Sequence, residues 1–412
     1  MNVAPRKSNP MPWQSLCVRE ERANGLERRR ELGQFFTSPD VAGFTWDLLE
    51  VIQGGRFPAN ARLIDPACGE GVFLRMAHER GGLPAKGLFG VDIDESLAPG
   101  WRGDSLLRGA KLLLANGLLD AAEVGIVEGT FDIVAGNPPF SGKGLRDLLR
   151  LLEEQDAPHH QEQDFFEVSC LKEEPAVPCL PLSAQQRAGL DRLVRALSQY
   201  SCWRLDAVPE QYDEVAPEPE TAPADLFGAA ALFDKPRPTA DDFERSARSI
   251  AHWPPNRALD TSRPEVRDVI RRLASTAIEV VFTERFIRLA KPGALIAVIV
   301  PESIVASDRL GPFRTWLLGR MDLLASVSLP QKVFTGVGAN AKTSIIFARR
   351  RLDRRPDDGY SPDALDESPG QDRPIFLAAP RLDSPGFSLE SYLARVLADA
   401  RREREKFWFD AK

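Results

Sequence analysis

The sequence has little cysteine, no long apolar run and no excess of positive charge. Its five cysteines are an odd number, are irregularly spaced and include no Cys-x-x-Cys pair. We therefore expect neither a disulfide framework nor a structural metal site, and a reducing cytoplasm is the predicted location. The chain has no stretch of 18 or more apolar residues, so no transmembrane helix is predicted. Met1 to Gln14 lacks the apolar core of a secretory signal.

The net charge of −7 is concentrated in one segment. Between Leu205 and Asp242, ten acidic residues stand against only Lys235 and Arg237, a net charge of −8, which leaves +1 for the rest of the chain. DNA-binding proteins often carry excess positive charge, because phosphate contacts supply most of their non-specific affinity. The bulk charge therefore gives no support for DNA binding and weak support against it.

Strands that alternate with helices predict an α/β fold with a mostly parallel, Rossmann-like sheet and helices on both faces. Short apolar runs predict strands at 63–64, 87–93, 111–115, 131–135, 294–300, 324–329 and 343–348. We expect the last of these runs to be the final strand of the sheet. Four helices are predicted from helical spacing or composition. One starts at Pro39, and the others span 72–79, 276–290 and 389–406.

This pattern divides the chain into five segments. They are a polar and basic arm (1–30), a ligand-binding half-domain (31–140), an insertion (141–265), a second half-domain (266–350), and a polar linker with a charged helix (351–412). The acidic and Pro-rich composition of 205–242 predicts that the insertion is partly disordered.

Asp65 to Gly71 is a glycine-rich turn between a predicted strand and a predicted helix. Glycines at 69 and 71 let the backbone approach a ligand where a Cβ would interfere, and the following helix points free N–H groups at it. Asp92 ends the next strand, about 20 residues further on, where an acid commonly holds a ribose hydroxyl pair. Ile93 beside it can pack on an adenine face. A tight structural turn and a solvated acid are the alternatives, and the joint pattern favours a nucleotide-like ligand.

The sequence Asn137-Pro138-Pro139-Phe140 directly follows the predicted strand 131–135. Two prolines fix φ at successive residues and hold the Asn137 side chain and the Pro138 carbonyl in a rigid frame. These two oxygens can accept both hydrogens of an exocyclic amine such as adenine N6, which aims the nitrogen lone pair at a methyl donor. Catalysis would then consist of positioning and electrostatics. Phe140 offers a flat face to an extruded base. A proline-stiffened loop that only closes a strand is the alternative.

With these motifs, the chain resembles the N6-adenine DNA methyltransferases of the gamma arrangement. That family includes the modification subunits of type I restriction systems and many restriction-associated adenine methylases. The resemblance covers about 30–140 and 265–350, and the motifs keep the family's order. It implies S-adenosyl-L-methionine (SAM) as cofactor, DNA as substrate and methyl transfer to the N6 amine of a flipped adenine. It also implies a restriction–modification or phage-defence setting.

The resemblance assigns roles to individual residues. Asn137-Pro138-Pro139-Phe140 would be the catalytic tetrad, and Phe334 would pack with Phe140 against the flipped base. Thr37 would hold the methionine carboxylate, and Asp65 would lie near the methionine amine. The expected cofactor contacts are, in chain order, Thr37, Asp65, Ala67, Gly69, Gly71, Asp92, Ile93, Asn116 and Phe282.

The chain departs from the family pattern in two places. The family has an acid after the third strand, where this chain has Asn116, with Asp120 as the alternative; an Asn oxygen can still accept from the adenine amine. The chain also ends about 60 residues after the expected last strand, which leaves little room for a target-recognition domain. We therefore expect a separate specificity or defence-complex subunit, or the 141–265 insertion, to select the DNA sequence.

Two other functions stay open. The same tetrad serves guanine N2 methylation in ribosomal RNA and glutamine methylation in release factors, and those families resemble this chain less at Thr37 and over 334–347. A SAM-binding but inactive subunit of a defence complex is the second alternative, against which the intact tetrad argues.

Two further groups of residues carry weaker signals. Arg28 to Arg30 either contact phosphate or form a solvated helix face. The remaining candidates fit no zinc spacing and are interpreted as buried or incidental; they are Cys170, Cys179, Cys202, His159 and His160.

Overall fold

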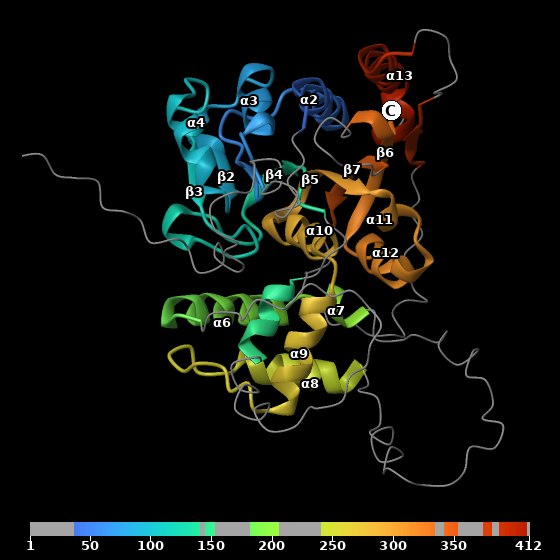
Figure 1. Ribbon diagram of the computed structural model, residues 1–412. Coiled ribbons are helices and arrows are strands. Elements are labelled where there is room, and N and C mark those ends of the chain that lie inside the picture. Colours follow the sequence, from blue (N-terminus) through green and yellow to red (C-terminus); the bar gives the residue numbers. More distant parts are fainter. Residues whose placement is uncertain are drawn as a thin grey trace, which may run out of the picture.

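The computed structural model describes residues 37–140, 145–152, 182–205, 240–333, 342–352, 374–380 and 387–409. These residues form one eight-stranded sheet with helices on both faces, and a group of helices lies beneath one face (Figure 1). The predicted α/β fold is therefore confirmed. None of the helices within these ranges is long and apolar enough to span a membrane.

The sheet is parallel except for one strand. Its spatial order is β3 (Lys111–Leu114), β2 (Leu88–Asp92), β1 (Leu63–Asp65), β4 (Phe131–Gly136), β5 (Ala290–Pro301), β7 (Thr343–Arg350), β6 (Met321–Leu329) and β8 (Phe376–Ala378). Only β7 runs antiparallel to both of its neighbours among these strands. The prediction that 343–348 is the final strand is wrong, because β7 inserts between β5 and β6 and β8 follows it.

Strand β5 shows how the sheet separates two cores. Leu295, Ala297 and Ile299 belong to one buried cluster, and the alternating residues Ile296 and Val298 belong to the other, as expected for side chains on opposite faces of a strand. The first core is covered by α2 (Pro39–Gln53), α3 (Val72–Glu79), α4 (Ala98–Gly103) and α13 (Leu389–Trp408). The second is covered by α10 (Ile278–Leu289), α11 (Glu302–Ala306) and α12 (Gly311–Leu318) (Figure 1).

Helix α2 begins as the sequence predicts. Ser38 caps it by accepting from the backbone N–H of Val41, Pro39 occupies the first turn, and Gly54 ends it in the left-handed conformation at φ 85°. Proline is tolerated at the helix start because the N–H that it lacks would have no partner there, and glycine takes the positive φ at no steric cost. This start fixes the position of Thr37 immediately before the helix.

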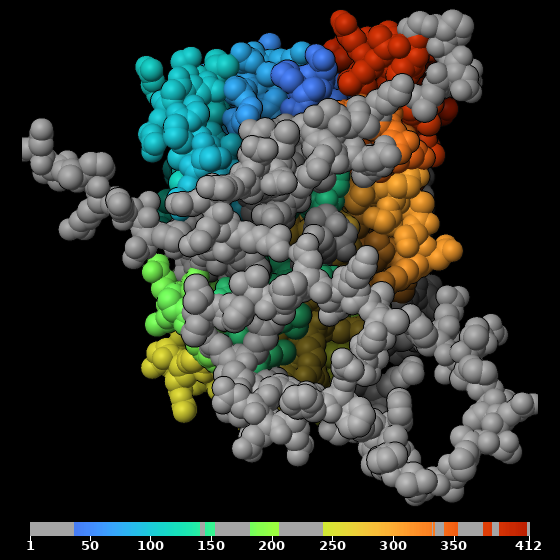
Figure 2. All heavy atoms as spheres, in the orientation of Figure 1, coloured from blue at the N-terminus to red at the C-terminus, as the bar shows by residue number. Residues whose placement is uncertain are grey.

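Helices α6 (Ala184–Ser198), α7 (Cys202–Leu205), α8 (Ala240–Ala251) and α9 (Pro264–Ser275) form a group that we call the helical unit. Its core, which includes Trp203 and Ile250, is continuous with the core under α10. Figure 2 shows the unit in green and yellow below the α/β part. The predicted insertion thus contains packed helices, and its predicted boundary at 265 falls inside α9. Most of the acidic stretch, 206–239, lies outside the described residues.

A buried carboxylate anchors the helical unit to the sheet domain. Glu284 of α10 has no solvent exposure and accepts from the backbone N–H groups of Ser201 (2.9 Å) and Cys202 (2.8 Å) and from Nε of Arg288 (2.9 Å). A buried charge is tolerated only when it is paired and hydrogen-bonded. These contacts therefore hold the start of α7 firmly against α10.

Candidate active site

The glycine-rich turn lies at the carboxyl end of β1. The Gly71 N–H donates to the Cys68 carbonyl at 2.8 Å, and Gly69 and Gly71 have φ values of 52° and 82°. L side chains rarely adopt such φ values. A Cβ on Gly71 would also lie 2.9 Å from the Leu107 side chain. The backbone conformation therefore favours glycine at both positions, and the Leu107 side chain would have to shift to admit a Cβ at 71.

Two acidic side chains brace this turn. The Asp65 Oδ1 atom accepts from the Ala67 N–H at 3.0 Å, and the Asp92 Oδ2 atom accepts from the Gly69 N–H at 2.8 Å. The other Asp92 oxygen accepts from the Asp94 N–H at 3.0 Å. Both carboxyls are buried. Ile93, the predicted adenine contact, follows Asp92 directly and is half-buried.

The electrostatics of Asp65 suit a cationic ligand. Burial, with a smaller contribution from the nearby Asp92 carboxylate, raises the pKa of Asp65 to about 8. Burial also raises the pKa of Asp92. An ammonium or sulfonium group placed beside these carboxyls would stabilise their charged forms.

Asp65→Asn is expected to raise the free energy of unfolding of the ligand-free protein at pH 9 and to change it little at pH 4. A raised pKa means that the stabilising contribution is fully present below the ordinary pKa of 3.8 and is lost as the pH rises to about 8. The amide keeps the shape of the neutral carboxyl but does not titrate, so the gain at pH 9 is on the order of a few kcal/mol. Urea unfolding across this pH range measures it. Asp308→Asn, at an exposed aspartate, is the control, and an identical pH profile for all three proteins would contradict the expectation.

The Asn-Pro-Pro-Phe motif begins where β4 ends. Asn137 is half-buried, with its Oδ1 atom shielded from solvent. Pro138 is buried and Pro139 half-buried. The Phe140 ring is only 5% exposed and packs in the core on the α2 side of the sheet. In this conformation, Phe140 therefore does not present an open face for stacking.

Strand β4 places Asn137 beside the glycine-rich turn. Strands β1 and β4 are parallel neighbours, and the strand order reverses at this pair, where ligands of α/β sheets usually bind. A Cβ on Gly136 would lie 2.3 Å from the Asp65 Oδ1 atom. Residue 136 must therefore be glycine for the Asp65 carboxyl and the β4 backbone to be so close.

One pocket collects five of the predicted residues. Thr37, Asp65, Ala67, Gly69 and Asn137 line it. It has an empty volume of about 460 Å³, including the part open to solvent. Residues from the N-terminus of α2, the turn after β1 and the end of β4 therefore meet at one site.

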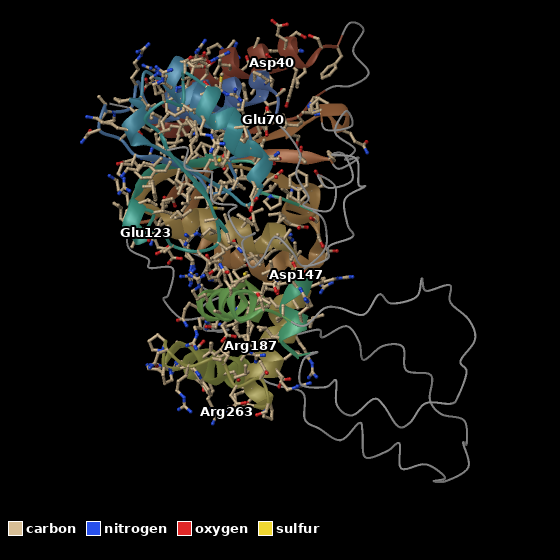
Figure 3. All side chains as sticks on the ribbon, turned by 60° about the vertical axis from the view of Figure 1, so that its left-hand side comes forward. Asp40, Glu70, Glu123, Asp147, Arg187 and Arg263 are labelled. Carbon is tan, nitrogen blue, oxygen red and sulfur yellow. The ribbon has the colours of Figure 1, made fainter. Side chains whose placement is uncertain are left out.

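The sequence reasoning missed other residues of this pocket. They are Pro39, Cys68, Glu70, Val72, Phe73 and Arg75. Glu70, labelled in Figure 3, lies in the turn itself, and Arg75 lies on α3, four residues after Gly71. Helical periodicity could have indicated Arg75, because a residue at that spacing shares a face with the helix start. The Arg75 Nη1 atom pairs with Asp104 at 3.2 Å.

Asn116 and Asp120, the two candidates for the adenine contact, have different partners. Asn116 follows β3, and its Oδ1 atom accepts from the Leu118 N–H at 3.0 Å. Asp120 is 40% exposed and pairs with Arg285 at 2.8 Å. Because the Asp120 carboxylate is engaged with Arg285, Asn116 remains the better candidate. Neither residue lines the pocket that contains Asn137.

The two predicted aromatics of the second half-domain have different outcomes. Phe282 is on α10, is 6% exposed and packs in the core opposite Phe140. It lies three residues before Arg285 and so on the same side of the helix. Phe334 lies outside the described residues, as do Arg28 to Arg30, Cys170, Cys179, His159 and His160. Within the described ranges, no three His, Cys, Asp or Glu side chains could together hold a metal ion.

A comparison with protein families agrees with this geometry. Residues 22–169 match the N-6 DNA Methylase family model. The matched segment is about a third of the chain and contains Thr37, the glycine-rich turn and the Asn137 motif. The predicted resemblance to N6-adenine DNA methyltransferases is therefore confirmed over residues 22–169.

Solved structures of methyltransferases are similar to the chain at low identity. A putative class I SAM-dependent methyltransferase from Listeria monocytogenes is 16% identical, with a TM-score of 0.43, over 91% of this chain and 72% of that one. A modification subunit of a putative type I restriction enzyme from Vibrio vulnificus YJ016 is 16% identical, with a TM-score of 0.38, over 79% and 46%. A type I methyltransferase subunit from Streptococcus thermophilus is 14% identical, with a TM-score of 0.37, over 90% and 53%. The chain thus spans about half the length of these two subunits.

Proposed function

We propose that this protein transfers a methyl group from SAM to the N6 amine of an adenine extruded from DNA. The observation that carries the proposal is the pocket in which Asn137, at the end of β4, meets Asp65 and the glycine-rich turn. The N-6 DNA Methylase match over the same residues supports the choice of acceptor. With DNA as substrate, we place the reaction in the cytoplasm.

Residues of the pocket and of the neighbouring strand ends fit SAM. The buried carboxyls of Asp65 and Asp92 suit its cationic methionine end and its ribose hydroxyls, respectively. Gly69 and Gly71 give the turn its positive-φ conformation, and Gly69 lines the pocket. Thr37 lines the pocket, and a threonine hydroxyl can donate to a carboxylate. Ala67, Ile93, Asn116 and Phe282 complete the proposed cofactor contacts.

The chemistry assigned to this chain is positioning. When bound, SAM supplies an electrophilic methyl group. Asn137 Oδ1 and the Pro138 carbonyl accept the two hydrogens of the adenine amine, and Pro139 keeps the loop rigid. This arrangement turns the nitrogen lone pair toward the methyl group and stabilises the charge that develops on nitrogen. Phe140 and Phe334 stack on the extruded base, which requires Phe140 to leave the core position described above.

We further propose that the DNA sequence is chosen outside the catalytic pocket, in a restriction–modification or defence setting. A separate specificity subunit or the helical unit would supply the groove contacts, because the pocket residues address only the flipped base. The basic composition of the helical unit supports its nearness to DNA: 182–205 and 240–275 contain eleven arginines and seven acidic residues.

Transfer of radiolabel from SAM tests the proposal. Purified protein, with and without its genomic neighbours, is incubated with unmethylated duplex DNA, ribosomal RNA and protein, and labelled nucleosides are separated. We expect label only in DNA, as N6-methyladenine. Label in RNA guanine or in protein glutamine would show that the acceptor is not adenine in DNA. SAM binding without transfer to any acceptor, even with the neighbours present, would indicate an inactive subunit.

A further inference from the structure

Arg285 of α10 reaches the segment that follows β3. Its side chain is 1% exposed, and its Nε atom donates to the Gly117 carbonyl at 2.9 Å. Its two terminal nitrogens pair with Asp120 at 2.8 Å and with Glu128 at 2.9 Å. One planar guanidinium therefore binds three separate oxygen groups, which a lysine ammonium on a single flexible stem could not do in the same geometry.

The glycine-rich turn contacts the same segment from its other side. A Cβ on Gly117 would lie 1.8 Å from the Pro66 carbonyl oxygen, so the two backbones are in close contact. The Ala115 N–H donates to the Asp92 carbonyl at 2.9 Å. Asn116 therefore lies between two residues, Ala115 and Gly117, whose backbones are held in place. It is next to the end of the strand that carries Asp92.

This bracing determines where the Asn116 amide points. Its Oδ1 atom already accepts from the Leu118 N–H at 3.0 Å, in the local pattern of an Asx turn. An amide oxygen has a second lone pair, which can accept from an adenine amine only if the turn keeps its position. Displacement of Gly117 would rotate this lone pair away.

We propose that Arg285 is a positioning residue for the adenine end of the SAM site. It fixes residues 116–120 between α10 and the glycine-rich turn, and Asn116 then recognises the exocyclic amine of the cofactor's adenine. Arg285 acts through Asn116 and does not touch the cofactor itself. The inference rests on the proposed use of SAM.

Ligand preference tests the inference. Calorimetry gives the dissociation constants of S-adenosylhomocysteine and of its counterpart that lacks the purine amine. For the wild type, we expect about a tenfold preference for the amine-bearing ligand, the value of one hydrogen bond. Arg285→Lys keeps the charge but loses the fork, and its preference should fall to about twofold or less, as in Asn116→Ala. The double variant should lose no more than either single variant, because both remove one interaction.

The control lies one turn further along the same helix. Arg288 is 2% exposed and also pairs with Glu128, at 3.2 Å. Its Nε and Nη2 atoms donate to Glu284 and to the Gln199 carbonyl, neither of which belongs to residues 116–120. Arg288→Lys should destabilise the protein comparably and leave the preference near tenfold. A purely structural role of Arg285 would weaken both ligands equally. An unchanged preference in Arg285→Lys would therefore overturn the inference.

Two further outcomes are separable. Failure of the wild type to bind either ligand would overturn the proposed function, and with it this inference. Equal binding of both ligands by the wild type would overturn only the Asn116 contact and the role of Arg285. If Arg285→Lys does not fold, Asp120→Asn takes its place, because that side chain is 40% exposed and its loss frees one arm of the guanidinium. It should lower the preference in the same direction, and no change would count against the inference.

Discussion

Asn137→Ala should abolish detectable N6-adenine methylation while the protein still binds SAM. The variant removes one of the two oxygens that are proposed to hold the adenine amine, and such a loss in a preorganised site typically lowers kcat by about 10²–10³-fold. The Oδ1 atom is shielded from solvent beside the Asp65 turn, so water cannot readily replace it. Single-turnover label transfer to DNA measures the rate, and calorimetry measures the affinity for SAM.

The matched control is Asn256→Ala, at an exposed asparagine of the helical unit. It should keep the wild-type rate and affinity. Thermal unfolding of both variants separates catalysis from folding. If Asn137→Ala methylated DNA within about threefold of the wild-type rate, Asn137 would be rejected as a catalytic residue. A threefold loss of rate is smaller than the loss expected for one such contact.

Among the variants proposed, Gly136→Ala should cause the largest combined loss of unfolding free energy and of affinity for SAM. The new methyl group would lie 2.3 Å from Asp65 Oδ1 and 2.6 Å from its Cγ, inside a packed region. Overpacking of this kind costs typically about 1–3 kcal/mol of unfolding free energy. The Asp65 carboxyl is 1% exposed and cannot move into solvent. It must therefore be displaced inside the protein, at the glycine-rich turn. We expect SAM affinity to fall at least about tenfold, equivalent to about 1.4 kcal/mol.

Gly100→Ala is the control for this substitution. Gly100 lies in α4, and a Cβ there would meet no heavy atom within 4 Å. Alanine in a helix is favoured over glycine by about 0.5–1 kcal/mol, so this variant should be slightly more stable and should bind SAM normally. Urea unfolding and calorimetry provide both values. Normal SAM binding by Gly136→Ala would show that the Asp65 position is not important for the cofactor.

Local signals in the sequence predicted the part of the fold that carries the pocket. Pro39 marks the start of α2, the glycines mark the turn after β1, and the apolar run before Asn137 marks β4. Each signal depends on neighbours within a few residues, where backbone conformation and capping decide the outcome. The meeting of Asp65 and Asn137 followed because carboxyl ends of parallel strands share one edge of a sheet. Thr37, which precedes α2, was predicted only from the family resemblance.

Features that depend on distant pairing were not predictable in this way. The position of β7 between β5 and β6 requires pairing with β5, which is not its neighbour along the chain. The helical unit was missed because α7 and α8 are separated by the acidic stretch, so that no continuous periodic pattern shows that they pack together. No local signal indicated a role for Arg285, because its partners Asp120 and Glu128 lie more than 150 residues earlier.

The separation of β4 from β5 has a consequence for how the chain folds. Strand β4, which ends at the proposed catalytic residues, pairs with β5, but the intervening chain is about 150 residues long. Synthesis at about 5–20 residues per second leaves the outer edge of β4 without its neighbour for roughly 8–30 s. Such an unpaired edge can associate with other chains, and contacts of this sequence separation form slowly. The step that completes the sheet beside Asn137 is therefore expected to limit the rate at which newly made protein becomes active.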